Sequence, residues 1–346
     1  MLISIPLPKK KYIIIIATLA QSFHMQGQQI QMLSSGRAVS LRGLSAVNDQ
    51  VIWVSGSGGT VGLSTDGGKN WKWMPVPRYF QSDFRDIEAF NSREAIIMGI
   101  TNPAVILRTT DGGNHWDTVF EDSSKSVFLD AMDITGDRVV LLGDPQQGII
   151  FIAESTDRGK SWKKRVPPAF DSVSTGETFF AASGSNIHYF SNNRYCLVSG
   201  GIKSNLYLSN GRYPLSLIQG KETTGANSIS VNPSDQNQAF ITGGDFSQDT
   251  LSSGNSLLIQ FFPFRQRIPA NPPHGYRSCV EYISASKMIC CGTTGVDISE
   301  DGGNHWKHIS DDGFHVCRKS KGGYKVFLAG AQGHISCLNM KALSIK

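Results

Sequence analysis

Three arginines occupy matching points of a recurring pattern in this 346-residue chain. The segments that contain them are Leu41-Arg42-Gly43-Leu44, Phe84-Arg85-Asp86-Ile87 and Tyr276-Arg277-Ser278-Cys279. Guanidinium groups held close together bind carboxylate, sulfate or phosphate through paired hydrogen bonds. If the three side chains reach one surface, they form an anion-binding site. The alternative is that each arginine pairs with a nearby acid and only fills space.

Further polar residues are expected on the same face and extend this candidate site. They are Asp144, Glu177, Lys203, Asp245 and Tyr276. The acids among them are also possible partners for the arginines, and the tyrosine ring suits a sugar or a peptide. The chain has neither a Gly-x-Ser-x-Gly nor a His-Glu-x-x-His motif, so we predict no catalytic residue, no metal site and no cofactor.

An internal repeat predicts the elements that position these residues. The pattern Ser/Thr-x-Asp-x-Gly-x-x-Trp occurs four times, at Asp66 and Trp71, Asp111 and Trp116, Asp157 and Trp162, and Asp301 and Trp306. The aspartates are 45, 46 and 144 residues apart. The last gap equals three repeats of similar length, so two copies have lost the motif but kept the spacing. Four short strands in about 45 residues are typical of a propeller blade.

Seven apolar strand-like runs, each ending at or near a glycine, predict seven blades. The last blade lacks an outer strand, and residues 29–33 after the N-terminal apolar run are a spare strand. Pairing of the two would remove the open edge of the ring. We therefore predict an all-β, seven-bladed β-propeller of four-stranded antiparallel blades, closed by an N-terminal strand, as a single domain over residues 27–346.

The repeated aspartates are predicted to be structural. An aspartate in a tight turn accepts hydrogen bonds from nearby backbone amides, and the following glycine supplies a positive φ. The tryptophan packs as a large apolar plate between sheets. A catalytic acid is needed once, not four times. These turns lie at the end of each blade opposite the arginines, so function is sought away from the motif.

This repeated motif, named the Asp-box, resembles that of the photosystem II stability/assembly factor-like proteins, and more distantly that of sialidases. The resemblance to the assembly factors covers nearly the whole chain after the first 26 residues. It implies a binding scaffold with an arginine-rich surface patch rather than an enzyme. The alternative is a sialidase-like glycoside hydrolase or a glycan-binding protein, in which the three arginines hold a substrate carboxylate. The expected partner is a protein or a glycan on the channel-mouth face.

The N-terminus predicts export. Lys9, Lys10 and Lys11 precede an apolar run over residues 12–20, the order found in secretory signals, and the run is too short to span a bilayer. We expect a signal peptide at residues 1–22, a periplasmic or secreted location, no stable membrane span after cleavage, and a monomer. Without those lysines the charge is nearly balanced, which gives no reason to bind nucleic acid.

Six cysteines are present, at 196, 279, 290, 291, 317 and 337. Their spacing matches no zinc motif. They are predicted to be small buried hydrophobic side chains, and the alternative is a bond from Cys279 to Cys290 or Cys291 across adjacent strands.

Overall fold

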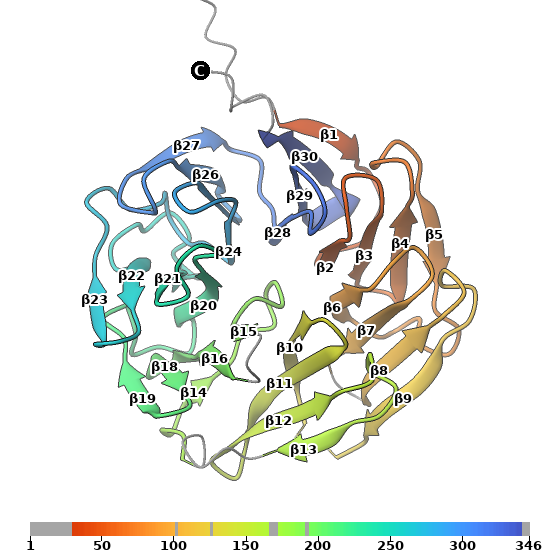
Figure 1. The fold of residues 1–346 in the computed structure, drawn as a ribbon, viewed down its shortest axis with the longest axis horizontal. Coiled ribbons are helices and arrows are strands. Elements are labelled where there is room, and N and C mark those ends of the chain that lie inside the picture. The colour runs from red at the N-terminus through yellow and green to blue at the C-terminus, as the bar shows by residue number, and fades with distance from the viewer. Residues whose placement is uncertain (1–29, 101–102, 125–126, 166–171, 191–193, 341–346) are drawn as a thin grey trace, which may run out of the picture.

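Strands make up almost all of the regular structure in the computed structural model, which describes residues 30–100, 103–124, 127–165, 172–190 and 194–340. They form seven antiparallel sheets arranged as blades around a central channel (Figure 1). In blades one to six the first of the four repeat strands lies nearest the channel and the last lies at the rim. The predicted seven-bladed β-propeller is therefore confirmed.

The first three blades follow the repeat closely. Blade one holds β2 (Leu41–Ala46), β3 (Ile52–Gly56), β4 (Thr60–Ser64) and β5 (Lys72–Pro75). Blade two holds β6 (Phe84–Ala89), β7 (Ala95–Gly99), β8 (Ala104–Thr109) and β9 (Asp117–Asp122). Blade three holds β10 (Leu129–Thr135), β11 (Arg138–Gln146), β12 (Ile149–Ser155) and β13 (Lys163–Arg165). Each sheet keeps this order from the channel outward.

Blades four and five depart from the simple repeat. Blade four holds β15 (Ile187–Tyr189), β16 (Tyr195–Val198), β18 (Asn205–Leu208) and β19 (Gly211–Pro214). Blade five holds β20 (Thr224–Val231), β21 (Gln238–Asp245), β22 (Ser256–Gln260) and β23 (Arg265–Arg267). Two short strands, β14 (Glu177–Thr178) and β17 (Gly200–Gly201), join its channel edge and make a sheet of six. Blade five thus has the four predicted strands, and its sheet is extended by two short strands from the connections of blade four.

The ring closes through the N-terminal strand, as predicted. Blade six holds β24 (Cys279–Tyr282), β25 (Met288–Gly292), β26 (Gly295–Ser299) and β27 (Trp306–Ser310). Blade seven holds β28 (Val316–Lys319), β29 (Lys325–Ala329) and β30 (Ile335–Asn339), with a 3-10 turn at Ala331–Gly333. Its outer strand is β1 (Gln31–Ser34), which pairs antiparallel with β30 through Gln31 and Cys337. The first and last described strands therefore share one blade.

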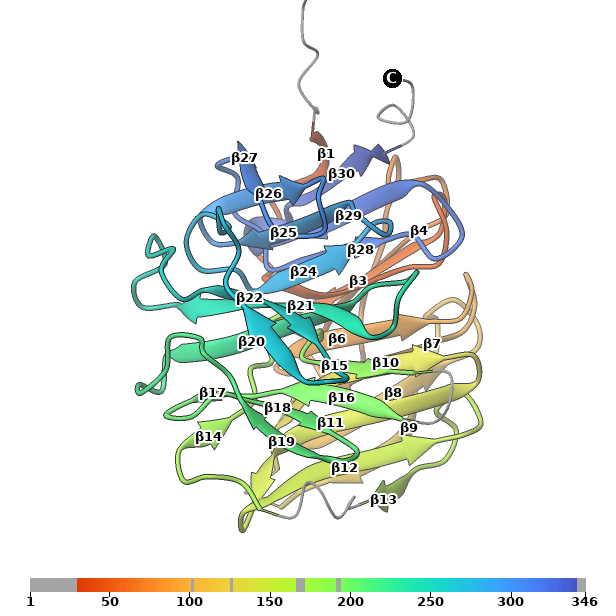
Figure 2. The ribbon, with the colours of Figure 1, turned by 60° about the vertical axis from the view of Figure 1, so that its left-hand side comes forward.

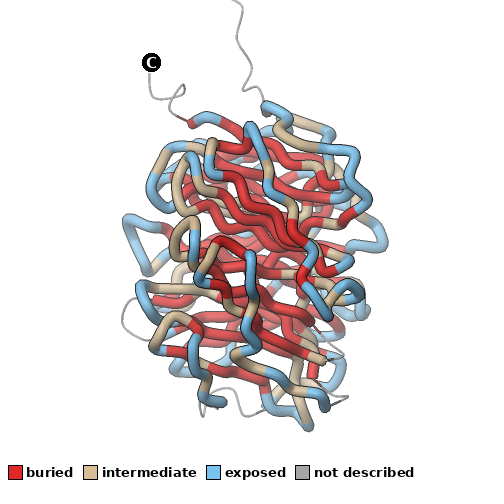
Figure 3. Tube along the Cα trace, turned by 90° about the vertical axis from the view of Figure 1, so that its right-hand side faces the viewer, coloured by how far each residue is buried: buried red, intermediate tan, exposed pale blue. Residues whose placement is uncertain are grey.

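The hydrophobic core lies between the blades. Inner and middle strands are buried on both faces, because each sheet packs against two neighbours (Figures 2 and 3). The largest cluster joins blades six, seven and one through residues such as Leu44, Ile289 and Phe327. The outer strands β5, β9 and β13 expose about half or more of their residues. None of the helical turns in the described part is long and apolar enough to cross a membrane.

The predicted signal peptide at residues 1–22 lies outside the described residues. All six cysteines lie within them, and all are buried free thiols.

Candidate functional site

A β-bulge near the start of the inner strand is shared by several blades. The pairing of β2 with β3 shifts between Leu41 and Gly43, which leaves Arg42 unpaired in the ladder. Equivalent shifts leave Arg85, Asp130 and Asn227 unpaired in blades two, three and five. A bulge redirects a side chain at the rim of a sheet. The same bulged position of the inner strand therefore places a side chain at the channel mouth in each of these blades.

The segment between β14 and β15 fills the channel behind this mouth. Its backbone carbonyls accept hydrogen bonds from arginines of three other blades: Ala181 from Arg85 at 3.5 Å, Ala182 from Arg42 at 3.3 Å, and Ser183 from Arg318 at 2.8 Å. Figure 1 shows this loop reaching into the centre of the ring from β15. We call residues 179–186 the channel plug. It separates two cavities, one at each end of the inner strands.

The cavity on the bulge side is the candidate site, here named the arginine pocket. It has a volume of about 460 Å³. Its walls include Arg42, Arg85, Asp144, Asn227, Tyr276, Ser278 and His315, with the aromatic rings of Phe128, Phe180 and Phe246. Phe246 begins the long loop before β22, and its ring packs edge-on against both Phe180 and Tyr276. The pocket thus combines two guanidinium groups with an aromatic wall.

The two guanidinium groups differ in their partners. Arg85 donates from Nε to Asp83 at 2.7 Å, and its side chain is 28% exposed. Arg42 makes no ion pair with any carboxylate in the described residues. Burial, and next the positive charge of Arg85, lower the pKa of Arg42, although an arginine remains charged at neutral pH. An anion in the pocket would therefore relieve a real repulsion between the two arginines.

Two titratable groups missed by the sequence analysis border the arginines. His315 lines the pocket, and burial followed by the charges of Arg42 and Arg85 lowers its pKa to about 3. Asp130 is fully buried with no hydrogen-bond partner for either carboxylate oxygen. Its burial, and then the nearby Asp144, raise its pKa well above the ordinary value, while Arg85 opposes that shift. His315 is therefore neutral near neutral pH.

Arg277 does not join the other two arginines, contrary to the sequence prediction. Its side chain is fully buried, and Nε donates to Asp297 at 2.6 Å. The backbone amide of Arg277 donates to Gly243, just as those of Leu41 and Phe314 donate to Gly330 and Gly292. Arg277 is thus equivalent to two core residues. One step along a strand turns a side chain to the other face, so Ser278, not Arg277, takes the place of Arg42.

Asp144 and Tyr276 lie at the arginine pocket. Asp144 accepts hydrogen bonds from Thr178 Oγ1 at 2.5 Å and from the Phe179 amide at 2.9 Å. Burial raises its pKa. Tyr276 donates its hydroxyl to Asn227 at 2.9 Å. Asp144 therefore anchors the channel plug as well as lining the pocket.

The remaining candidates lie elsewhere. Glu177 is buried and accepts hydrogen bonds from Asn205, Tyr207 and Ser199. Asp245 is buried and accepts from the amide and hydroxyl of Ser247. Lys203 is exposed on the loop after β17. None of the three lines the arginine pocket.

The repeated aspartates hold the turns between third and fourth strands. In each turn Oδ1 accepts a hydroxyl hydrogen bond at 2.8 to 3.0 Å and an amide hydrogen bond at 2.9 to 3.0 Å; the acceptors are Asp66, Asp111, Asp157 and Asp301. The indoles of Trp71, Trp162 and Trp306 donate to glycine carbonyls of the same turns. Trp116 instead packs edge-on against Trp53. These contacts are all internal to the chain, so the repeated residues stabilise the turns.

The described residues contain no group of three or more histidine, cysteine or acidic side chains placed to hold a metal ion.

The fold and the pocket define a class: a seven-bladed propeller that presents a charged and aromatic cavity at one channel mouth. No family model matches the chain. The predicted resemblance to the photosystem II assembly factors is confirmed by sequence. The chain is 24% identical over 158 residues to the chloroplastic photosystem II stability/assembly factor HCF136 of Arabidopsis thaliana, covering 42% of this chain and 37% of that protein. It is 37% identical over 75 residues to the photosystem II assembly protein Ycf48 of a Synechococcus strain, covering 21% and 22%.

The matched segments thus span well under half the length of these relatives. Solved structures agree on the fold. A Ycf48 bound to a D1 peptide has a TM-score of 0.65 and 16% identity, covering 90% of this chain and 95% of that one. Ycf48 from Cyanidioschyzon merolae has a TM-score of 0.64, also at 16% identity, covering 90% and 99%.

Proposed function

We propose that this chain is a non-enzymatic binding scaffold that holds a segment of a partner protein in the arginine pocket. A carboxylate of the partner, at a chain end or on an acidic side chain, binds between Arg42 and Arg85. Apolar side chains beside it pack against the aromatic wall. The convergence of these two arginines from neighbouring blades on one cavity is the observation that carries the proposal.

The electrostatics of the pocket support an anionic ligand. Among the described residues, Arg42 has only a backbone carbonyl as its hydrogen-bond partner, and that bond is long at 3.3 Å. A carboxylate gives a stronger, charge-assisted hydrogen bond. Since His315 stays neutral, the two arginines supply the positive charge by themselves. The partner therefore needs one carboxylate for the two arginines, and it needs no group that pairs with His315.

The aromatic wall supports a peptide rather than an inorganic anion. Phe180, Phe246 and Tyr276 pack around one side of the cavity, and Phe246 is 47% exposed. Aromatic surfaces next to charged anchors are typical of protein-binding sites. The similar fold of a Ycf48 captured with a D1 peptide adds support for a peptide ligand.

The test is calorimetric titration of the purified chain, without residues 1–22, with short apolar peptides that end in a free carboxylate or in an amide. We expect the free-acid peptides to bind and the amides to bind at least about tenfold more weakly, the loss expected for a charge-assisted hydrogen bond. The variant Arg42→Gln with Arg85→Gln should lose the difference. The matched control is Arg165→Gln, an exposed arginine on β13, which should bind as the unmodified chain does.

Equal binding of acid and amide forms, or an unchanged double variant, would refute the arginine pocket as the site.

We further propose that the chain is exported and acts as a monomer. N-terminal sequencing of the protein recovered from a cell-envelope or culture fraction, with light scattering of the purified form, tests both points.

The sialidase-like alternative needs three arginines around one carboxylate. The structure brings two of the predicted three to the pocket, so that alternative is not proposed.

A further inference from the structure

Three of the six cysteines meet at one point between blades six and seven. Cys279 on β24 lies directly opposite Cys291 on β25. Cys317 on β28 is the third, and its carbonyl oxygen lies 3.3 Å from Cys279 Sγ, where the protonated thiol donates to it. The thiols of Cys291 and Cys317 both hydrogen-bond to that of Cys279. All three residues are buried.

Arg318 gives this cluster its charge. Its Nη1 lies 3.1 Å from Cys279 Sγ, and Ser185 Oγ lies 3.6 Å from the same sulfur. Burial opposes ionisation of Cys279. The hydrogen bonds from the other two thiols and the charge of Arg318 outweigh it and hold the pKa of Cys279 well below its usual value. A thiolate, not a thiol, is the nucleophile in cysteine chemistry.

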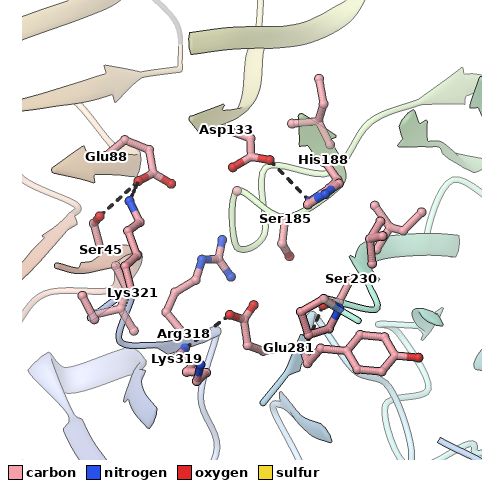
Figure 4. A pocket seen from close by; sticks show the side chains of 18 residues that line it. Ser45, Glu88, Asp133, Ser185, His188, Ser230, Glu281, Arg318, Lys319 and Lys321 are labelled. Atoms are coloured by element: carbon pink, nitrogen blue, oxygen red, sulfur yellow. Dashed lines mark hydrogen bonds and ion pairs between the residues drawn. The ribbon is translucent and has the colours of Figure 1, made fainter. Parts of the chain in front are cut away.

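The cluster lies against the second cavity of the channel. This channel cavity, on the side of the plug away from the arginine pocket, has a volume of about 260 Å³. Arg318 and Ser185, which both contact Cys279 Sγ, line this cavity, and Figure 4 shows them with Glu281 around the same open space. Cys279 itself is fully buried and does not line the cavity, so a peroxide in the cavity reaches the sulfur only when Arg318 or Ser185 moves.

Cys290 provides an internal contrast. It neighbours Cys291 in the sequence and is equally buried, but its side chain points to the other face of β25. There its Sγ lies 3.8 Å from Asp297. Burial and then the negative charge of Asp297 raise the pKa of Cys290 well above its usual value. Cys290 and Cys279 thus have opposite electrostatic surroundings.

We propose that Cys279 is a peroxide-reactive thiolate and that Cys291 resolves its oxidised form. The thiolate sulfur attacks one oxygen of a hydroperoxide; the S–O bond forms, the O–O bond breaks, and the leaving oxygen takes a proton from solvent. Cys279 becomes a sulfenic acid. Cys291 sulfur then attacks Cys279 sulfur, the S–O bond breaks, and water leaves with the Cys291 proton. The peroxide gains two electrons and the two cysteines become a disulfide.

The strand geometry suits this second step. Directly opposed residues on antiparallel strands have Cα atoms about 4.5 to 5.5 Å apart, within the range that a disulfide spans. The site is independent of the arginine pocket, which lies on the other side of the plug.

The test exposes the folded full chain to hydrogen peroxide and maps the cysteines by mass spectrometry under non-reducing conditions. We expect a Cys279–Cys291 disulfide to form. In Cys291→Ser, a sulfenic acid should persist at Cys279 and be trapped by a cyclic diketone. Cys279→Ser should abolish both products, and the matched control Cys290→Ser should react at the unmodified rate. In the folded wild-type chain, peroxide should modify Cys279 at least about tenfold faster than Cys290, because the reactivity of a cysteine follows its thiolate content.

The urea-unfolded chain serves as a reference that needs no variant, since its six cysteines lose their different surroundings. The selectivity for Cys279 should disappear there. If Cys279 and Cys290 react equally slowly in the folded chain, the reactive-thiolate proposal is overturned. A disulfide from Cys279 to Cys317 instead would overturn the role given to Cys291.

Discussion

Arg277 and Asp297 form a buried ion pair inside blade six: Nε of the arginine lies 2.6 Å, and Nη2 2.5 Å, from the same carboxylate oxygen. The second Asp297 oxygen lies 3.1 Å from His308 Nδ1. The pair holds the segment before β24 onto β26. It explains why an arginine with the right sequence spacing is absent from the channel mouth.

We predict that Arg277→Met destabilises the fold without creating or removing a binding site. It removes the arginine partner of the buried Asp297 carboxylate and leaves only His308 beside it; loss of one partner of a buried ion pair typically costs about 3–5 kcal/mol. Arg85→Met breaks a more exposed pair with Asp83 and should cost less than about 1 kcal/mol. Urea unfolding of both variants measures the difference. Equal losses would show that the buried pair has no special role.

The channel plug makes a second prediction, at Gly184. Its φ is +63°, and a Cβ there would lie 2.3 Å from the Asp86 carboxylate. Gly184→Ala should therefore cost both backbone strain and a steric clash, roughly 1–3 kcal/mol for the clash alone. Gly136 has φ +62° but open space around it, so Gly136→Ala measures the cost of backbone strain without a steric clash. The unfolding free energies of the two variants should differ by the clash, and identical values would mean that the plug moves aside freely.

The repeat made most of the fold predictable from the sequence. Asp-containing turns at a constant spacing mark the third and fourth strands, and the glycine-ended runs mark the second strands. The spare strand before residue 34 was identified because the last blade lacked one. Blade five could not be predicted as it stands, because β14 and β17 contain only two residues each and carry no periodic signal.

The site was less predictable because it depends on a single-residue register. Arg277 follows an aromatic residue, as Arg85 follows Phe84, so a comparison of the sequence segments alone aligns the two arginines. The ladder decides otherwise: the amide of Arg277 bonds to the preceding blade as that of Leu41 does. Matching the glycine that ends each second strand would have given the correct offset. His315 would then have aligned with Arg42, since Gly330 follows β29 as Gly56 ends β3.

The turn aspartates predict an acid-sensitive stability. Hydrogen bonds in the folded turns hold the pKa of Asp157 and Asp301 at about 2, despite an opposing effect of burial. A carboxyl group with a depressed folded pKa stabilises the fold above its unfolded pKa, near 4, and loses that effect as the pH falls toward 2. The melting temperature should therefore drop through this window, and less steeply in Asp157→Asn. Asp312→Asn, on an exposed residue outside any repeated turn, is the control and should retain the full slope.

His315 reports on the arginine pocket directly. Its folded pKa of about 3 lies below the usual value near 6.5, so the unfolded chain takes up a proton where the folded chain does not. Its neutral form thus contributes stability above pH 6.5, and this contribution declines as the pH falls toward 3. A carboxylate bound between Arg42 and Arg85 reduces the positive charge around the ring, and the pKa of His315 should then rise.

Histidine NMR titrations with and without a free-acid peptide measure that rise. The resonances of exposed His305, at the opposite end of the ring, give the reference within the same spectra. Peptide affinity itself should stay constant between pH 8 and pH 5, because His315 is neutral across that interval and the arginines keep their charge. A strong gain in affinity on acidification would mean that a titrating group of the pocket, His315 or Asp144, controls binding rather than the arginine pair alone.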